Sequence, residues 1–345
     1  MQNIRGKKIV VNLNDIPEME KELEKVNHHI ERLCQSENES MQKMMDWVLQ
    51  ARGKQIRPIL TLLCSKLKGK KVDATEIAAV IEICHTASLI HDDIIDEADV
   101  RRGQFSLQKE FGKEMAVYAG DFMIFSTIGR TSLMNKPWYR TMFAKLEIMC
   151  NGEVGQFDNR YNIEITEEQY LSNIIGKTSA MFEIACVAGA YEGKCNDIER
   201  KAIENFAEKF GLLFQLRDDL MDFVSTNSIS KKTIHNDFWC GYYTLPAIHT
   251  FSHPKYGAEL KYIASEVKKG LHSSEIDRKI AELINASGGC LYTIALIEKY
   301  AQEAKECLTV FKESIAKRKL IEVIDKLLLS IDNLNIDKVS SSKIV

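Results

Sequence analysis

Two acidic clusters with identical spacing are the feature that most restricts this chain. The first lies in SLIHDDIIDEADVRRG and the second in FQLRDDLMDF, and their members are Asp92, Asp93, Asp96, Asp218, Asp219 and Asp222. Leu and Ile side chains border the first cluster, and Leu, Met and Phe side chains border the second. On a helix, residues i and i+4 share a face. Each cluster therefore projects two carboxylates from one side of an apolar helix.

The clustered carboxylates require positive charge nearby. Two of them at this spacing repel each other by roughly 1 kcal/mol in water, and by more in a drier site. Mg2+ prefers oxygen ligands and is often held by one or two carboxylates together with substrate phosphates. Arg101 and Arg102 follow the first cluster and carry forked donors suited to phosphate oxygens. A single cluster is equally compatible with a solvated charge run at a helix end. The repetition favours two facing helices that share metal ions bridging one polyphosphate.

Apolar residues recur at helical spacing along most of the chain, and alternation of period two is nearly absent. The stripe from Ile16 to Leu33 predicts a first helix that packs onto the body or onto a partner subunit. Further helices are expected behind an N-cap at Ser40, over 56–67, 74–96, 113–133, 137–159, 167–191 and 197–222, and in several segments after Pro254. We expect one all-α domain over 1–345, with a helix and arm over 1–39 and a frayed tail over 332–345.

The composition excludes several classes of protein. Lys and Arg number 46 against 49 Asp and Glu, a net charge of −3 without a basic block, so nucleic-acid binding is not indicated. The nine cysteines lack metal-finger spacing and several lie among apolar residues, which is typical of thiols in a reducing cytosol. We find neither a secretory signal nor an apolar run near the ~20 residues of a transmembrane helix. A cytoplasmic protein is expected.

With these motifs in this order, the sequence resembles the trans-type isoprenyl (polyprenyl) diphosphate synthases. The resemblance runs from Gly53 to Pro246, and more weakly to Leu329, and it includes the upstream GKQIRP and the GKT between the clusters. It implies a single-domain helical bundle of the isoprenoid synthase type with a central active-site cavity, and a homodimer. It also implies condensation of isopentenyl diphosphate with an allylic diphosphate (geranyl, farnesyl or geranylgeranyl) through an allyl cation. Metal ions, cationic side chains and exclusion of water would stabilise the charges that develop.

The resemblance assigns roles to individual residues. The six aspartates would bind Mg2+, as three ions when substrate is present, or Mn2+, and through the metal the allylic diphosphate. Arg101, Lys177, Thr178 and Lys232 would complete the binding of that diphosphate, and Gln215 would lie near the reacting carbons. Catalysis is expected to depend most on Asp92, Asp93, Asp96, Lys177, Gln215 and Asp218. The released diphosphate would serve as base, because no side chain stands out for that role.

A second, metal-free pocket would hold isopentenyl diphosphate through Lys54, Arg57, His85 and Arg102. The spacing of Lys54 and Arg57, just after Gly53, allows a helix start to direct both side chains and its free N–H groups at one anion. Without the resemblance, His85 would be interpreted as a core histidine and Lys177 as a solvated lysine.

The chain departs from the family pattern in its second half. KKTIHNDFWCGYYTLPAI matches that pattern at Lys232, Asp237, Gly241 and 244–246, but Tyr242 stands where a diphosphate-binding lysine is usual, and Lys231 replaces a usual glycine. One missing cation weakens diphosphate binding by about 1 to 3 kcal/mol. Both aspartate clusters are intact, so an active enzyme is expected.

Product length can be predicted from the residues that precede the first cluster. Ser88, Ala87 and Cys84 lie four, five and eight residues before Asp92 and are small, and eight helical residues span roughly 12 Å. An elongating tail should pass this level. We expect a medium-to-long all-trans product, hexaprenyl or longer, with Phe125 or Ile128 as a deeper floor and Ala87→Phe shortening the product.

Four alternatives remain open at this point. They are a short-chain farnesyl or geranylgeranyl diphosphate synthase, a catalytic subunit that requires a partner, a regulatory subunit with weak activity of its own, and a terpene cyclase. Non-catalytic partners typically lose the aspartate clusters, and a cyclase would not need the pocket of Lys54, Arg57 and Arg102. A long product would also favour peripheral contact with a membrane.

Overall fold

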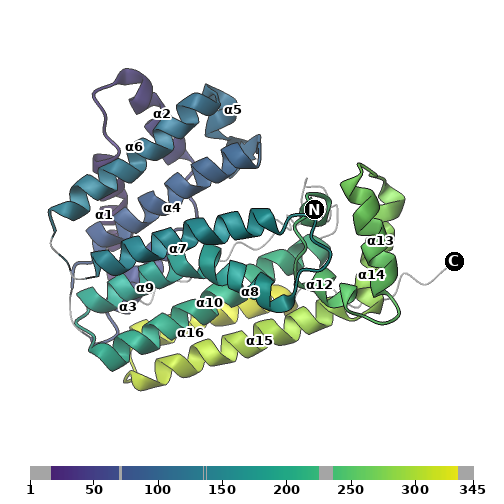
Figure 1. Ribbon diagram of the computed structural model, residues 1–345. Coiled ribbons are helices and arrows are strands. Elements are labelled where there is room, and N and C mark those ends of the chain that lie inside the picture. The colour runs from purple at the N-terminus through teal and green to yellow at the C-terminus, as the bar shows by residue number, and fades with distance from the viewer. Residues whose placement is uncertain (1–16, 70–71, 135, 137, 225–235, 333–345) are drawn as a thin grey trace, which may run out of the picture.

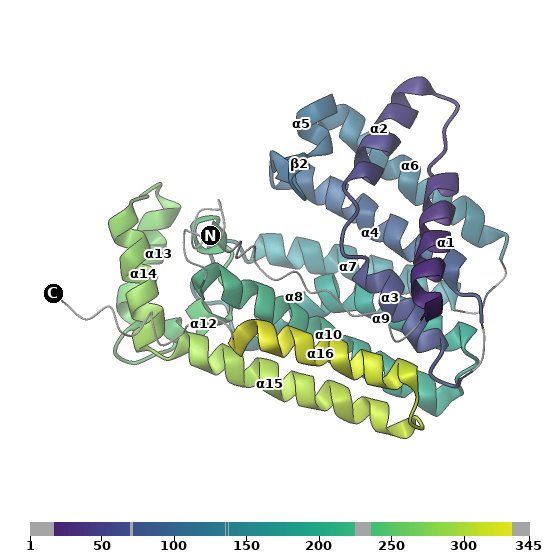
Figure 2. The same ribbon diagram turned by 180° about the vertical axis from the view of Figure 1, so that it is seen from behind.

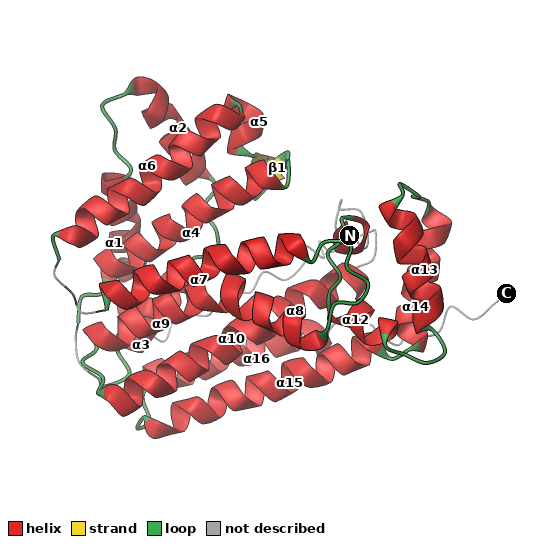
Figure 3. Ribbon diagram, in the orientation of Figure 1, coloured by secondary structure: helices red, strands yellow, loops and turns green. Residues whose placement is uncertain are grey.

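Helices make up almost all of the computed structural model, which describes residues 17–69, 72–134, 136, 138–224 and 236–332 (Figure 3). The first half contains α1 (Pro17–Leu33), α2 (Glu39–Gln50), α3 (Ile56–Ser65), α4 (Thr75–Ile95), α5 (Leu107–Phe111), α6 (Lys113–Ser132) and α7 (Tyr139–Asp158). The second half contains α8 (Glu167–Ile174), α9 (Ala180–Glu192), α10 (Asp197–Val224), α11 (Asn236–Trp239), α12 (Leu245–Phe251), α13 (Gly257–Lys268), α14 (Ser274–Ala286), α15 (Gly289–Cys307) and α16 (Ile315–Asp332). The all-α prediction is confirmed.

The long helices pack side by side around α4, α9 and α10, which carry most of the predicted site. α10 packs against α9 and α15, α3 packs against α9, and α4 packs against α6 and α1. Figures 1 and 2 show α13 and α14 at one end of the molecule, away from α1 and α2. The C-terminal ends of α4 and α10, which carry the two acidic clusters, therefore belong to helices with different main packing partners.

The first helix forms where the apolar stripe predicts it. Met19, Val26 and Ile30 are buried, and α1 packs on α4 and α3. Of the two predicted alternatives, the body of the same chain or a partner subunit, the structure shows the first. Ile16, the arm before it, Lys231, Lys232 and the tail after residue 332 lie outside the described residues.

Several local expectations need correction. The N-cap of α2 is Asn38, whose side chain accepts from the Met41 N–H, and not Ser40. The helix expected over 167–191 begins at the predicted capping box of Thr166 and Gln169, but a π-helical turn, η1 (Ile175–Ser179), interrupts it. A hairpin of β1 (Val100–Arg101) and β2 (Gln104–Phe105) was not predicted, because two-residue strands leave no alternating pattern.

Five of the nine cysteines are buried, three are partly buried and Cys150 is exposed; all nine are free thiols. Among the described helices, no single one is both long and apolar enough to cross a membrane. The bent pair formed by α14 and the segment 289–310 meets that criterion by length and composition alone.

Glycine allows α3 and α9 to approach closely. A Cβ on Gly189 of α9 would lie 2.2 Å from the backbone oxygen of Thr61 on α3. Gly189→Ala should therefore force the helices apart and lower the free energy of unfolding by about 1 to 3 kcal/mol. Gly129, an exposed residue of α6, is the matched control, because a Cβ there would meet no atom within 4 Å. Gly129→Ala should raise the free energy of unfolding by about 0.5 to 1 kcal/mol.

Denaturant unfolding of the two variants measures both effects. Equal stability changes in Gly189→Ala and Gly129→Ala would contradict the close packing of α3 and α9.

Candidate active site

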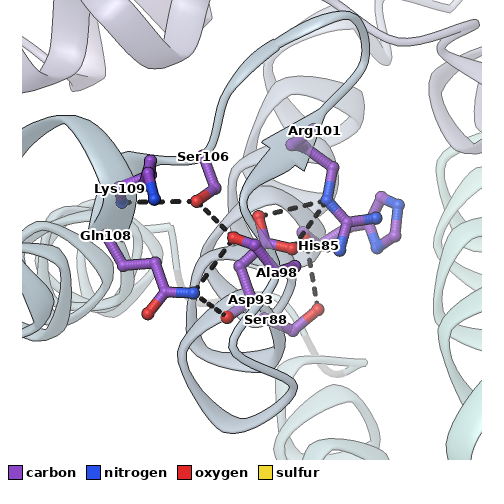
Figure 4. A network of polar contacts seen from close by, with 8 residues as sticks. All are labelled: His85, Ser88, Asp93, Ala98, Arg101, Ser106, Gln108 and Lys109. Atoms are coloured by element: carbon purple, nitrogen blue, oxygen red, sulfur yellow. Dashed lines mark hydrogen bonds and ion pairs between the residues drawn. The ribbon is translucent and has the colours of Figure 1, made fainter.

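The first acidic cluster lies at the C-terminal end of α4, and its middle carboxylate is already paired. Asp93 is buried, at 4% exposure, and accepts hydrogen bonds from the Arg101 guanidinium. The Nε of Arg101 lies 2.9 and 3.1 Å from the two carboxylate oxygens of Asp93 (Figure 4). Asp92 is partly buried and Asp96 is exposed. The three aspartates therefore differ in environment, and Asp93 holds Arg101 in place.

The hairpin that carries Arg101 is tied to the end of α4. The Gln108 side-chain amide donates to the backbone oxygens of Asp93 (2.6 Å) and Ala98 (3.0 Å). Ser106 donates through its hydroxyl to the Ala98 oxygen at 2.5 Å and caps α5. These bonds position Arg101 next to the acidic cluster (Figure 4).

Lys177 faces the first cluster from the π-helical turn. Its ammonium group bonds Glu153 at 2.7 Å and Gln156 at 2.9 Å, both on α7. Burial lowers the pKa of Lys177, but the carboxylates of Glu153, Asp92 and Asp96 outweigh it, so the pKa is raised and the side chain is cationic. Glu153 was not predicted, because nothing in its local sequence distinguishes it from a solvated helix glutamate.

Burial, together with the negative charges of Glu153 and Asp96, raises the pKa of Asp92 to about 6, while Lys177 and Arg101 oppose the shift. The end of α4 is thus an acidic centre whose own cations do not fully neutralise it. A bound cation would remove this excess of negative charge.

The π-helical turn results from close backbone packing. Gly176 lies against Gly152 of α7. A Cβ on Gly152 would be 2.8 Å from the backbone nitrogen of Lys177. The turn projects neighbouring side chains to different helices: Lys177 reaches α7, and Thr178 donates to the Gln215 side-chain oxygen of α10 at 2.8 Å. π-Helical turns often occur at functional sites.

A hydrogen-bonded chain fixes the second acidic cluster on α10. The Gln215 amide donates to one oxygen of Asp219 at 2.7 Å, and the Tyr170 hydroxyl of α8 donates to the other at 2.5 Å. Burial raises the pKa of Asp219 to about 7, with Asp237 adding to the shift and the two hydrogen bonds opposing it. Each oxygen of Asp219 therefore accepts one hydrogen bond from the protein, and the metal-ligand role of Asp219 stays a prediction. Tyr170 was not predicted.

The other two carboxylates of this cluster lie at the end of α10. Asp218 accepts from Arg217 at 2.6 Å, and Asp222 accepts from the Asp237 N–H at 3.2 Å. The turn after α11 connects the clusters: burial raises the pKa of Cys240, and the charges of Asp96 and Asp222 both raise it further. Asp96 at the end of α4 and Asp222 of α10 therefore both lie near this turn.

Within the described part of the chain, no three acidic, histidine or cysteine side chains form a ready-made metal site. The donor set nevertheless fits Mg2+, which commonly takes one or two carboxylates and completes its shell with phosphate oxygens and water. Asp92 and Asp96 supply such a pair, in a centre where burial and like charge already disfavour the carboxylate form of Asp92.

The predicted cationic pocket forms where α3 meets α4, about two helical turns before Asp92. Arg57 of α3 lies 2.8 Å from the His85 ring nitrogen, and its guanidinium sits 4.5 Å from the Phe182 ring centre. Arg102 donates to the Ala51 oxygen at 3.0 Å. A Cβ on Gly53 would lie 2.5 Å from the Arg102 guanidinium, so a larger residue there would displace this group. Lys54 is exposed at the entrance to α3.

Arg57 carries an unsatisfied donor in this pocket. Its Nε is buried and has no hydrogen-bond partner. Burial lowers the pKa of Arg57 to about 10; Glu82 opposes the shift and Arg102 adds to it. Burial and the neighbouring arginines hold the pKa of His85 well below its usual value, so the imidazole is neutral. Two arginines and an unpaired N–H make a site for a phosphate-type anion.

The residues predicted to control product length separate into two groups. Cys84 contacts the Thr127 hydroxyl of α6 at 3.5 Å, and Ser88 donates to the His85 backbone oxygen. Ala87 is fully buried in the main hydrophobic core. Phe125 and Ile128 are 66% and 39% exposed. Their prediction as a tunnel floor is wrong, because they lie on the outer face of α6, whereas Thr127 faces α4.

Comparison with known proteins assigns the family. The profile described as "Polyprenyl synthetase" matches residues 38–284. The chain belongs to this family. Octaprenyl diphosphate synthase of Escherichia coli (strain K12) is 31% identical over 316 residues, which cover 90% of this chain and 97% of the relative. Heptaprenyl diphosphate synthase component 2 of Bacillus subtilis (strain 168) is 28% identical over 304 residues, covering 88% and 86%.

A solved structure supports the same assignment for this polyprenyl synthetase. The polyprenyl synthase from Caulobacter crescentus CB15, crystallised with calcium and isoprenyl diphosphate, superposes with a TM-score of 0.84 at 26% identity, covering 94% of this chain and 99% of that one. The protein is an all-α prenyltransferase of the trans-isoprenyl diphosphate synthase family.

The charge at Asp92 makes a testable contribution to stability. Because the pKa of Asp92 is raised, the carboxyl group contributes stability below its ordinary pKa of 3.8, and this contribution is lost as pH rises through about 6. Without metal at pH 7.5, Asp92→Asn should therefore raise the free energy of unfolding by about 1 to 3 kcal/mol. The gain should vanish near pH 4, as thermal unfolding in the presence of a chelator would record.

The matched control is Glu24→Gln on the exposed face of α1, which should have no effect at either pH. A less stable Asp92→Asn protein at pH 7.5 would mean that Asp92 is not in an acidic centre.

Proposed function

We propose that this polyprenyl synthetase condenses isopentenyl diphosphate with an allylic diphosphate head to tail and releases a medium-to-long all-trans polyprenyl diphosphate and diphosphate. One observation carries the proposal: two anion sites of different chemistry lie next to each other along α4. The side with Asp92, Asp96 and Lys177 combines carboxylates with a cation, and the side with Arg57 and Arg102 offers guanidinium groups beside a neutral His85.

The acidic side suits the allylic diphosphate. Asp92 and Asp96 would hold Mg2+, and Asp222 of α10 lies near the same turn, at Cys240, as Asp96. The ion would neutralise charge on the departing diphosphate. Lys177 and Arg101 are fixed by Glu153 and Asp93, and both can donate to the same diphosphate as the carbon–oxygen bond breaks and its electron pair leaves with the diphosphate.

The arginine side suits isopentenyl diphosphate, because it needs no metal. The buried Nε of Arg57 lacks a partner, and Arg102 lies close against Gly53. The double bond of isopentenyl diphosphate would attack the allyl cation to form one carbon–carbon bond. A proton would then pass to the released diphosphate. A terpene cyclase has no use for this second site, so the condensation is favoured over cyclisation.

An apolar column below the acidic side provides a path for the product tail. A second hydrophobic cluster joins α4, α7 and α9 below Cys84, and its members are Ile77, Ile81, Trp138, Tyr139, Met142, Met181, Ile184, Ala185 and Ala188. From Asp92 to Ile77 the helix spans about 22 Å. Trp138 closes the column: it is 2% exposed, its ring lies 4.4 Å from that of Tyr139, and its N–H donates to Glu192 at 3.3 Å.

Trp138 also borders a cavity of about 290 Å³ between α7, α9 and the start of α10. Trp138→Ala should join this cavity to the column and shift the product distribution by at least one isoprene unit toward longer chains. Trp138→Phe should shift it less. Chromatography of dephosphorylated products measures the change, and an unchanged distribution in a folded Trp138→Ala protein would contradict this path.

Two further proposals concern the setting of the enzyme. The outer faces of α6 and α7 lie on the same side of the molecule and expose Tyr118, Phe125, Ile128, Phe143, Val154 and Phe157 (Figures 1 and 2). A second copy of the chain would bury these side chains in a homodimer, although the name of the Bacillus subtilis relative, a "component 2", makes a different partner the alternative.

The nine free cysteines support a cytoplasmic location, and a long product would favour peripheral membrane contact.

The proposal is tested by incubating the purified chain with Mg2+, isopentenyl diphosphate and farnesyl diphosphate. A ladder of longer products that requires both substrates and metal is expected. Turnover of the allylic substrate without isopentenyl diphosphate would indicate a cyclase. Sedimentation of the same preparation should give a dimer, and condensation only after a second protein is added would establish the heteromeric alternative.

A further inference from the structure

The segment after α7 is joined to the turn after α11, at the mouth of the site. The Tyr161 N–H donates to the Gly241 oxygen at 2.8 Å, and its hydroxyl donates to the Trp239 oxygen at 3.3 Å. Arg160 donates through Nε to the Cys240 oxygen at 2.6 Å. Three backbone oxygens in succession thus receive donors from two adjacent residues, and the two segments are held in one register.

Gly241 makes this contact possible. Its φ is +81°, and a Cβ there would lie 2.5 Å from the Tyr161 ring. The backbone conformation and the ring contact both require glycine at this position. The placement of Arg160 therefore depends on packing as well as on a single hydrogen bond.

The Arg160 guanidinium lies over the ring of Tyr242, with its central carbon 5.4 Å from the ring centre. Among the described residues, no carboxylate pairs with Arg160, and the Cys240 oxygen is its hydrogen-bond acceptor. Its two terminal nitrogens thus retain donors that can bind an anion. A guanidinium stacked on an aromatic ring is also restricted in orientation, which reduces the entropy lost on binding.

The turn that carries Tyr242 is bonded to the second acidic cluster. The Tyr242 N–H donates to the Asp237 oxygen at 2.8 Å, and the Asp237 N–H donates to the Asp222 carboxylate at 3.2 Å. The Arg160 guanidinium, which lies over the Tyr242 ring, is therefore held close to the acidic end of α10. Burial and the charge of Asp96 raise the pKa of the Tyr242 phenol, and the positive charges of Arg160 and Lys177 oppose the shift.

We propose that Arg160 binds the diphosphate of the allylic substrate and supplies the cation that Tyr242, lacking a charge, does not. The inference rests on the proposed function. As the allylic carbon–oxygen bond breaks and the electron pair leaves with the diphosphate, the terminal N–H groups of Arg160 donate to its oxygens. The Tyr242 ring and the Cys240 oxygen hold the guanidinium in position. This role leaves the aspartates proposed to bind metal unchanged.

The test compares Arg160→Gln, Tyr242→Lys and the double variant with the wild type. Arg160→Gln keeps a donor for the Cys240 oxygen but removes the charge. It should raise the KM for the allylic diphosphate about tenfold to a hundredfold, with the KM for isopentenyl diphosphate unchanged. In the double variant, the lysine should restore most of the loss. Arg140→Ala, on the exposed start of α7, is the control and should behave as wild type.

Calorimetry with inorganic diphosphate and Mg2+ gives a second readout that does not need turnover. Wild type should bind diphosphate, and Arg160→Gln should bind it at least tenfold more weakly, with the double variant again restored. An unchanged KM and affinity in Arg160→Gln, or a loss that Tyr242→Lys does not restore, would overturn the role of Arg160. Absence of condensation by the wild type, with diphosphate binding still sensitive to Arg160, would overturn the proposed function instead.

Discussion

The repulsion among carboxylates at the end of α4 is the interaction on which the rest of the site depends. Asp92, Asp96 and Glu153 carry like charge in a partly buried place, and burial raises the pKa of Asp92 to about 6. The fold brings Lys177 on a π-helical turn and Arg101 on a short hairpin to this point. These cations reduce the repulsion without removing it, so the centre retains affinity for a metal ion and its bound diphosphate.

The arginine pocket along α4 has the reverse imbalance. Arg57 and Arg102 lie beside a neutral His85, and Glu82 is the nearby carboxylate that opposes the lowered pKa of Arg57. A centre with excess negative charge therefore lies next to a pocket with excess positive charge. Two diphosphates that must react without exchanging places can be distinguished in this way, because one needs metal and the other does not.

The sequence was sufficient to predict the helices and the two acidic clusters, because apolar residues and aspartates recur at helical spacing within single segments of the chain. It could not predict partners that come from distant segments. Glu153 beside Lys177, Tyr170 on Asp219 and Glu82 beside Arg57 are ordinary helix residues until the helices pack. The same limit explains the error at Phe125 and Ile128: spacing gives the face that a residue shares with its neighbours, but not which helix covers that face. The floor at Trp138 became visible only with α7 and α9 in place.

The central claim is that the two diphosphate sites differ in their need for metal. Titration calorimetry of the purified chain with isopentenyl diphosphate, and separately with an unreactive thio-analogue of farnesyl diphosphate, tests it directly when each is run with Mg2+ and with a chelator. We predict that isopentenyl diphosphate binds equally well in both conditions and that the farnesyl analogue binds only with Mg2+. Equal dependence of both ligands on metal would contradict the division into a metal-dependent and a metal-free site.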